Sequence, residues 1–129
     1  MRDESDFPQR ALTREVIAAF YEVYNHFRGG YLEAVYAGAL AIELRDRGIA
    51  FRREARLEVR YKGQLAGNYR ADFLIEQQLV IELKACVAVG ELDRKQLLNY
   101  LRITRMPLGL VLHFGPEAHV LRVINSSPD

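Results

Sequence analysis

Residues 69–85 read YRADFLIEQQLVIELKA, which is two apolar runs separated by a polar tripeptide at 76–78. Runs of this length on either side of a short polar turn predict two antiparallel strands in a hairpin. Three charged residues interrupt the apolar runs, namely Asp72, Glu82 and Lys84. A solvated strand face would accommodate all three, so the hairpin alone does not distinguish an ordinary surface from a functional site.

The length of the turn sets which residues of the two strands face each other. If positions 76–78 form the turn, Asp72 lies directly opposite Glu82, and Lys84 shares their face of the sheet. Two carboxylates opposite each other repel, and burial raises that cost unless a positive charge lies between them. Mg²⁺ takes carboxylate oxygens as ligands, so the hairpin is a candidate metal site. A two-residue turn would shift the register by one and separate the acids.

Outward from the hairpin, the spacing of apolar residues predicts three helices and five strands. Helical spacing begins at Thr13, a candidate N-cap, and ends at Gly29-Gly30. The remaining predicted elements are a helix from Leu32 to Arg47, strands at 51–61, 66–75 and 79–86, a helix over 92–104, and strands at 108–114 and 118–124. The order α-α-β-β-β-α-β-β predicts an α/β (α+β) sandwich.

Length and composition indicate one domain of ordinary type. The chain has 129 residues, half of them hydrophobic, and a net charge of +1, so it lacks a global basic field. We expect a frayed N-terminus over 1–11, a folded domain over 12–125 and a tail over 126–129. The single cysteine, Cys86, excludes an intramolecular disulfide, and we expect it to be a small buried hydrophobe. We see neither a membrane-spanning run nor a signal peptide, and we expect no membrane association and a cytoplasmic location.

Several short motifs recur in a fixed order along the chain. They are GYLEAVY (30–36), YKG (61–63), YRADF (69–73), VIELKA (80–85), QLLNYL (96–101), GLVLHFG (109–115) and VLRVIN (120–125). Together they closely resemble the bacterial and archaeal family named for its G-x-x-E-x-x-Y motif, here Gly30, Glu33 and Tyr36. That family is placed in the PD-(D/E)XK nuclease-like superfamily, and the resemblance spans about residues 12–125.

The resemblance implies a restriction-endonuclease-like fold, with a mixed central sheet flanked by helices, and Mg²⁺- or Mn²⁺-dependent cleavage of nucleic acid. It implies catalytic roles for the motif aspartate, the E-x-K pair and a Q-x-x-x-Y element, which are Asp72, Glu82, Lys84, Gln96 and Tyr100. It implies metal binding by Asp72, Glu82 and the helical acid Glu33, with the Leu83 carbonyl as a further ligand. The chain departs from the family at Asp93 and His113, where histidine and asparagine are common.

Arginines cluster where the second helix meets the first strand: Arg45, Arg47, Arg52, Arg53 and Arg56. They form either a solvated face or a patch that follows a phosphate backbone. With Arg70, the residues Arg52 and Arg53 are our candidate contacts to nucleic acid, which we expect to be DNA. A homodimer is a further expectation, because many nucleases of this superfamily act on two strands.

Two alternatives to an enzyme remain open. One is a catalytically silent nucleic-acid-binding or assembly module, which a structure with Lys84 or Arg70 in the metal position would favour. The other is a structural partner domain, which predicts no salt-dependent binding of DNA or RNA. The intact set of Asp72, Glu82 and Lys84 favours the nuclease.

Overall fold

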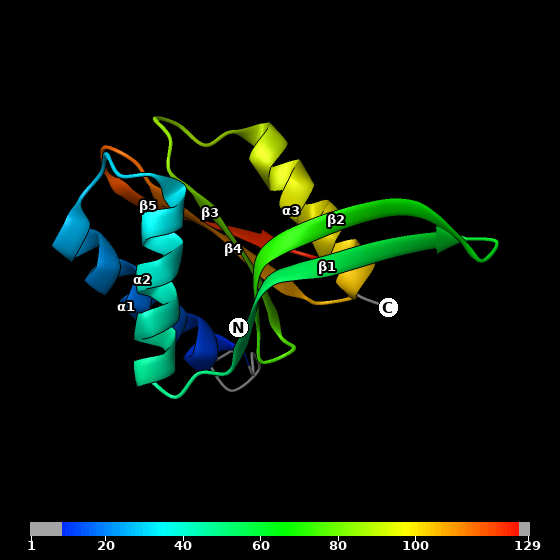
Figure 1. The fold of residues 1–129 in the computed structure, drawn as a ribbon, viewed down its shortest axis with the longest axis horizontal. Helices are drawn as coiled ribbons and strands as arrows, with labels where there is room; N and C mark the ends of the chain where they lie inside the picture. The colour runs from blue at the N-terminus through cyan, green and yellow to red at the C-terminus, as the bar shows by residue number, and fades with distance from the viewer. Residues whose placement is uncertain (1–8, 127–129) are drawn as a thin grey trace, which may run out of the picture.

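The computed structural model describes residues 9–126, which form a mixed sheet with helices on both faces (Figure 1). The elements are α1 (Arg10–Phe27), α2 (Glu33–Asp46), β1 (Phe51–Tyr61), β2 (Gln64–Ile75), β3 (Leu79–Lys84), α3 (Glu91–Thr104), β4 (Leu108–Phe114) and β5 (Ala118–Ile124). Their order confirms the predicted α-α-β-β-β-α-β-β fold. Within the described residues, no helix is both long and apolar enough to cross a membrane.

The five strands of the sheet lie in sequence order, β1-β2-β3-β4-β5. Strand β3 pairs with β4 in parallel, and the other neighbours are antiparallel. Parallel neighbours need a long crossover connection, and α3 lies in the crossover that joins β3 to β4. The sheet is therefore mixed, as predicted.

The two faces of the sheet are covered by different helices, and the side chains of β3 show which helices lie on each face. Leu79, Ile81 and Leu83 pack in a core cluster with residues of α1 and α2. Val80 packs in a second cluster with residues of α3. Because side chains alternate along a strand, Glu82 lies on the α3 face of β3.

The start of α1 differs from the prediction. The helix begins at Arg10, and Thr13 is buried inside it, with its backbone N–H bonded to the Gln9 carbonyl at 2.8 Å. Thr13 is therefore not the N-cap, because the helix continues one turn further toward the N-terminus. Of the stretch expected to be frayed, residues 10–11 belong to α1 and residues 1–8 lie outside the described part of the chain.

The end of β3 also differs from the prediction. The strand stops at Lys84, and Cys86 lies beyond it on the surface, so the expectation of a buried cysteine was wrong. The parallel ladder ends at the pair of Lys84 and His113, after which the chain turns away toward α3. The His113 ring donates a hydrogen bond from Nε2 to the Cys86 carbonyl at 2.7 Å, which ties this turn to β4.

Strands β1 and β2 bend together and extend as a two-stranded projection, which we call the arm and define as residues 55–71 (Figure 1). The bend coincides with Glu54, whose φ of +49° lies in a region that non-glycine residues seldom adopt. Ala71 and Phe73 are two residues apart, yet they pack in clusters on opposite faces of the sheet. The strand therefore changes its inward face at Asp72.

Candidate functional site

Asp72 and Glu82 meet where β2 and β3 separate. The ladder between these strands is regular as far as the pair Phe73–Ile81. At the next position, hydrogen bonds to carboxylates replace the backbone ladder. The Asp72 N–H donates to Glu82 Oε2 at 2.8 Å, and the Leu83 N–H donates to Asp72 Oδ2 at 2.8 Å. Each carboxylate thus binds the backbone of the opposite strand, which confirms the register predicted from the three-residue turn.

The Glu82 carboxyl is buried, with 5 % of the residue exposed. Burial, and next the nearby charge of Asp72, raise its pKa to about 8. The hydrogen bond from the Asp72 backbone and the charge of Lys84 oppose this rise. A raised pKa favours the protonated form of Glu82 beside Asp72, and a cation bound between the two carboxylates would favour the ionised form instead.

Lys84 lies on the same face of β3 as Glu82, and 29 % of its side chain is exposed. Its Nζ is 3.6 Å from Asp93 Oδ1 in the first turn of α3, and its charge also lowers the pKa of Glu82. Asp93 Oδ2 accepts a hydrogen bond from the Gly90 N–H at 2.9 Å, which caps α3. One aspartate therefore both caps the helix and holds the lysine.

The role of Asp93 was not predicted, although the sequence carries one signal for it. An acid three residues after a helix-starting glycine is a capping pattern. The pattern predicts where α3 begins, but it does not predict that Lys84 reaches the same carboxylate.

Gln96 and Tyr100 lie one turn apart on α3, and Gln96 Nε2 donates to the Tyr100 hydroxyl at 3.1 Å. Burial, and then the charge of Glu82, raise the pKa of Tyr100, so the phenol lies within electrostatic reach of the acid pair. The ring of Tyr100 also contacts Tyr69 on the arm, with centroids 5.9 Å apart. The structure thus brings the predicted Q-x-x-x-Y element to the acid pair and ties it to the arm.

Glu33 approaches the same region from the first turn of α2. Burial raises its pKa first and the charge of Asp72 second, while the Ala85 backbone and Lys84 oppose the shift. Among residues 9–126, no group of three or more His, Cys, Asp or Glu side chains is placed to hold a metal ion. Asp72 and Glu82 therefore meet as a pair, with Glu33 close enough to influence Asp72 but outside a ready-made cluster.

The loop before Glu33 is fixed by buried contacts. Gly30 has φ +103°, a conformation that favours glycine. The ring of Tyr36 is fully buried and stacks on Phe114, with centroids 4.2 Å apart. Its hydroxyl donates to the Arg28 carbonyl and accepts from the Tyr31 N–H. Tyr36 thus fastens the α1–α2 loop to the sheet and positions the start of α2, which carries Glu33.

The structure separates the three arginines proposed as nucleic-acid contacts. Arg53 lies over the ring of Phe73, 5.6 Å from its centroid. Arg70, on the arm, is 3.9 Å from a carboxylate oxygen of Glu54. Arg52 lines a separate shallow hollow beside the β2–β3 turn. Arg53 and Arg70 thus flank Asp72 along the hairpin, whereas Arg52 lies nearer the turn.

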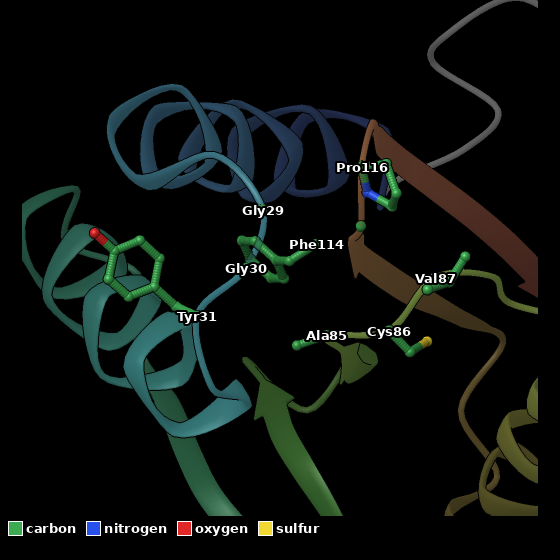
Figure 2. Close-up of a pocket in the computed structure, with 9 residues that line it drawn as sticks. Gly29, Gly30, Tyr31, Ala85, Cys86, Val87, Phe114 and Pro116 are labelled. Atoms are coloured by element: carbon green, nitrogen blue, oxygen red, sulfur yellow. The ribbon is translucent and has the colours of Figure 1, made fainter.

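A hollow of about 490 Å³ lies beyond the end of β3, where the α1–α2 loop meets the end of β4 (Figure 2). Glycines, Ala85, Cys86 and Phe114 are among the residues that line it, and none of its lining residues is charged. In Figure 2 the Tyr31 side chain extends away from Cys86. The hollow borders the site through Ala85, but it does not contain the acid pair.

The donor set of the acid pair fits a hard divalent cation. Asp72 and Glu82 offer carboxylate oxygens, the ligands that Mg²⁺ and Mn²⁺ prefer. Each carboxylate has one oxygen bound to a backbone N–H, which orients it without using its other oxygen. Burial and the charge of Asp72 raise the pKa of Glu82, and a cation bound at the pair would oppose that shift.

Residues 10–123 match the model of the PD-(D/E)XK nuclease superfamily. No curated protein and no solved structure matches the chain. The matched region includes every candidate site residue described above, from Glu33 to Tyr100.

Proposed function

Because the chain belongs to the PD-(D/E)XK nuclease superfamily, we propose that it is a metal-dependent nuclease that hydrolyses phosphodiester bonds, with DNA as its substrate. The observation that carries this proposal is the contact between Asp72 and Glu82 at the β2–β3 fork. Lys84 on the face of Glu82 supplies the positive charge that completes the D…E-x-K set. We further assign the chain to the family named for G-x-x-E-x-x-Y, because Gly30, Glu33 and Tyr36 match its motif.

In this proposal Asp72 and Glu82 hold Mg²⁺ or Mn²⁺, with Glu33 and the Leu83 carbonyl as further candidate ligands. A bound divalent cation would lower the pKa of its water and polarise the scissile phosphate. Lys84 places an ammonium where negative charge develops during hydrolysis, and such placed charges are a large catalytic contribution.

Gln96 and Tyr100 lie on α3, near the acid pair. Gln96 orients the Tyr100 hydroxyl through their hydrogen bond, and the ring lies within electrostatic reach of Glu82. We assign both residues to positioning the acid pair and the attacking water.

A catalytically silent nucleic-acid-binding module is the second candidate. Two observations favour it: among residues 9–126 the acid site is a pair and not a group of three, and Lys84 is paired with Asp93. The two candidates differ in whether the bound strand is cut, so a cleavage assay separates them.

We expect the purified protein to cut at least one of single-stranded, duplex, flap and junction DNA when Mg²⁺ or Mn²⁺ is present, and EDTA to stop the reaction. Asp72→Asn should abolish cleavage, because it removes a charged ligand, while the amide oxygen can still accept from the Leu83 N–H. Thermal melts above about pH 8, where Glu82 is ionised, should show the variant to be at least as stable as the wild type without metal, because the repulsion is gone. Gel assays of product length measure the cleavage.

Asp46→Asn, at the exposed end of α2, is the matched control and should cleave like the wild type. A protein that cuts none of these substrates with either metal would contradict the nuclease. If that protein still bound DNA with an affinity that falls with salt, the binding module would replace it.

A further inference from the structure

The arm carries two arginines that face each other across its strands. Arg56 on β1 is the direct partner of Arg70 on β2. Their neighbours Ala55, Leu57 and Ala71 pack in the cluster that contains α3. Because side chains alternate along a strand, Arg56 and Arg70 point away from α3 and into solvent.

This placement sets two positive charges opposite each other with one carboxylate close to them. Directly opposed residues of an antiparallel pair have Cβ atoms about 5 Å apart, and like charges there are unfavourable. Within residues 9–126, no carboxylate lies within 4.0 Å of the Arg56 guanidinium, and Arg70 has only the exposed Glu54 at 3.9 Å. The protein itself therefore offers this pair of guanidinium groups one loose counterion.

The outer part of the same arm carries an arginine, Arg60, that has partners on the arm itself. Arg60 is 3.3 Å from Glu58 and also lies within hydrogen-bond distance of the Gly63 carbonyl. Its charge is thus balanced locally. At the tip of the arm Lys62 lies over the ring of Tyr61, 5.5 Å from its centroid. Arg56 and Arg70 are the two positive charges that face each other directly across the arm, at the end that is nearer to β3.

We propose that Arg56 and Arg70 together bind one backbone phosphate of the nucleic acid, which we call the phosphate seat. Guanidinium groups have a planar set of donors that matches phosphate oxygens, and two of them can share one phosphate. Arg70 precedes Asp72 by two residues, which is about 7 Å along a strand. Because Arg56 and Arg70 point away from α3 while Glu82 lies on the α3 face, the seat holds a different phosphate from the one at the acid pair and fixes the position of the strand.

This inference rests on the proposed function, because it assumes that nucleic acid is the ligand. It also changes which arginines we assign to binding: Arg56 joins Arg70, and Arg52 is left out because it lines the hollow beside the β2–β3 turn.

The test is the salt dependence of binding to a short fluorescent DNA duplex in EDTA, where no cleavage occurs. Each phosphate contact contributes a slope of about −0.9 to a plot of log affinity against log salt. Because the two arginines share one phosphate, the double variant Arg56→Gln/Arg70→Gln should reduce the magnitude of the wild-type slope by about 0.9. Arg60→Gln is the control, because it removes one positive charge from the same arm, at an arginine that is paired with Glu58, and its slope should be unchanged.

A second variant separates binding from stability. Arg56→Glu puts a carboxylate opposite Arg70, so its melting temperature should rise while its affinity for DNA falls. An unchanged slope in the double variant, with wild-type protein that binds, would overturn the seat and leave the nuclease proposal standing. Wild-type protein that binds neither duplex nor single strand would overturn both. A reduced slope in EDTA, together with no cleavage by the wild type in a separate assay with Mg²⁺ or Mn²⁺, would support the seat and contradict the nuclease.

Discussion

Replacing Lys84 with methionine should lower the rate of metal-dependent cleavage by about 10²–10³-fold, the usual cost of removing one group that stabilises charge in the transition state. Methionine keeps much of the apolar stem but removes the ammonium that lies between Asp93 and the acid pair. The loss should appear in kcat more than in KM, because the charge is needed where negative charge develops during the reaction. Single-turnover cleavage of a saturating substrate measures it.

Lys95→Met provides the control, because Lys95 is an exposed lysine two residues after Asp93 on α3. It should cleave at the wild-type rate. A readout apart from cleavage also exists: the charge of Lys84 lowers the pKa of Glu82, so its removal should raise that pKa further. Equal cleavage rates in Lys84→Met and the wild type would show that Lys84 has no catalytic role and only forms an ion pair with Asp93.

Without metal, the free energy of unfolding should fall as pH rises between about 4.5 and about 8 because of Glu82. In this range the folded protein holds a proton on Glu82 that the unfolded chain has lost, so higher pH favours the unfolded state. One group of this kind contributes about 1.4 kcal/mol per pH unit. Glu82→Gln should remove that contribution and should be the more stable protein at pH 8. Denaturant melts in EDTA at a series of pH values measure it.

Glu22→Gln, on the exposed side of α1, is the matched control and should keep the pH dependence of the wild type. Added Mn²⁺ should flatten the wild-type dependence, because a bound cation favours ionised Glu82, and calorimetry in two buffers should detect the release of about one proton. Glu82→Gln with the same pH dependence as the wild type would mean that Glu82 is ionised in the folded protein, and the acid pair would then need another source of positive charge.

Much of the fold was predictable because local signals agreed with each other. The polar tripeptide at 76–78 forms a three-residue turn, and the length of that turn alone predicts that Asp72 lies opposite Glu82. Alternation along β3 placed Lys84 on the face of Glu82. Both statements depend on contacts between residues close in sequence, where the geometry of strand and turn leaves little freedom.

The bend of the arm was not predictable in the same way. Strict alternation from Phe73 would put Ala71 on the face of α1 and α2, but it packs with α3. The change occurs opposite Glu54, whose positive φ has no signal in the sequence, since glutamate seldom adopts it. Which side of the arm carries Arg56 and Arg70 follows from that bend, so the phosphate seat required the structure.

Long-range partners were also missed where one residue has two roles. Asp93 caps its own helix, which a pattern can suggest, and it also holds Lys84 from another element, which a pattern cannot. Cys86 follows an apolar strand and was expected to be buried, but the strand ends two residues earlier and leaves it exposed. In both cases the outcome depends on where β3 ends relative to α3.

The central claim is that Asp72 and Glu82 form the metal site, and Mn²⁺-soaked crystals test it most directly. The soak belongs above about pH 8, where Glu82 has lost its proton. The account predicts an anomalous-difference peak in contact with both carboxylates, and no peak at that position in Asp72→Asn crystals. A wild-type peak elsewhere on the protein, with Asp72 and Glu82 still joined only to each other and to the backbone, would contradict it.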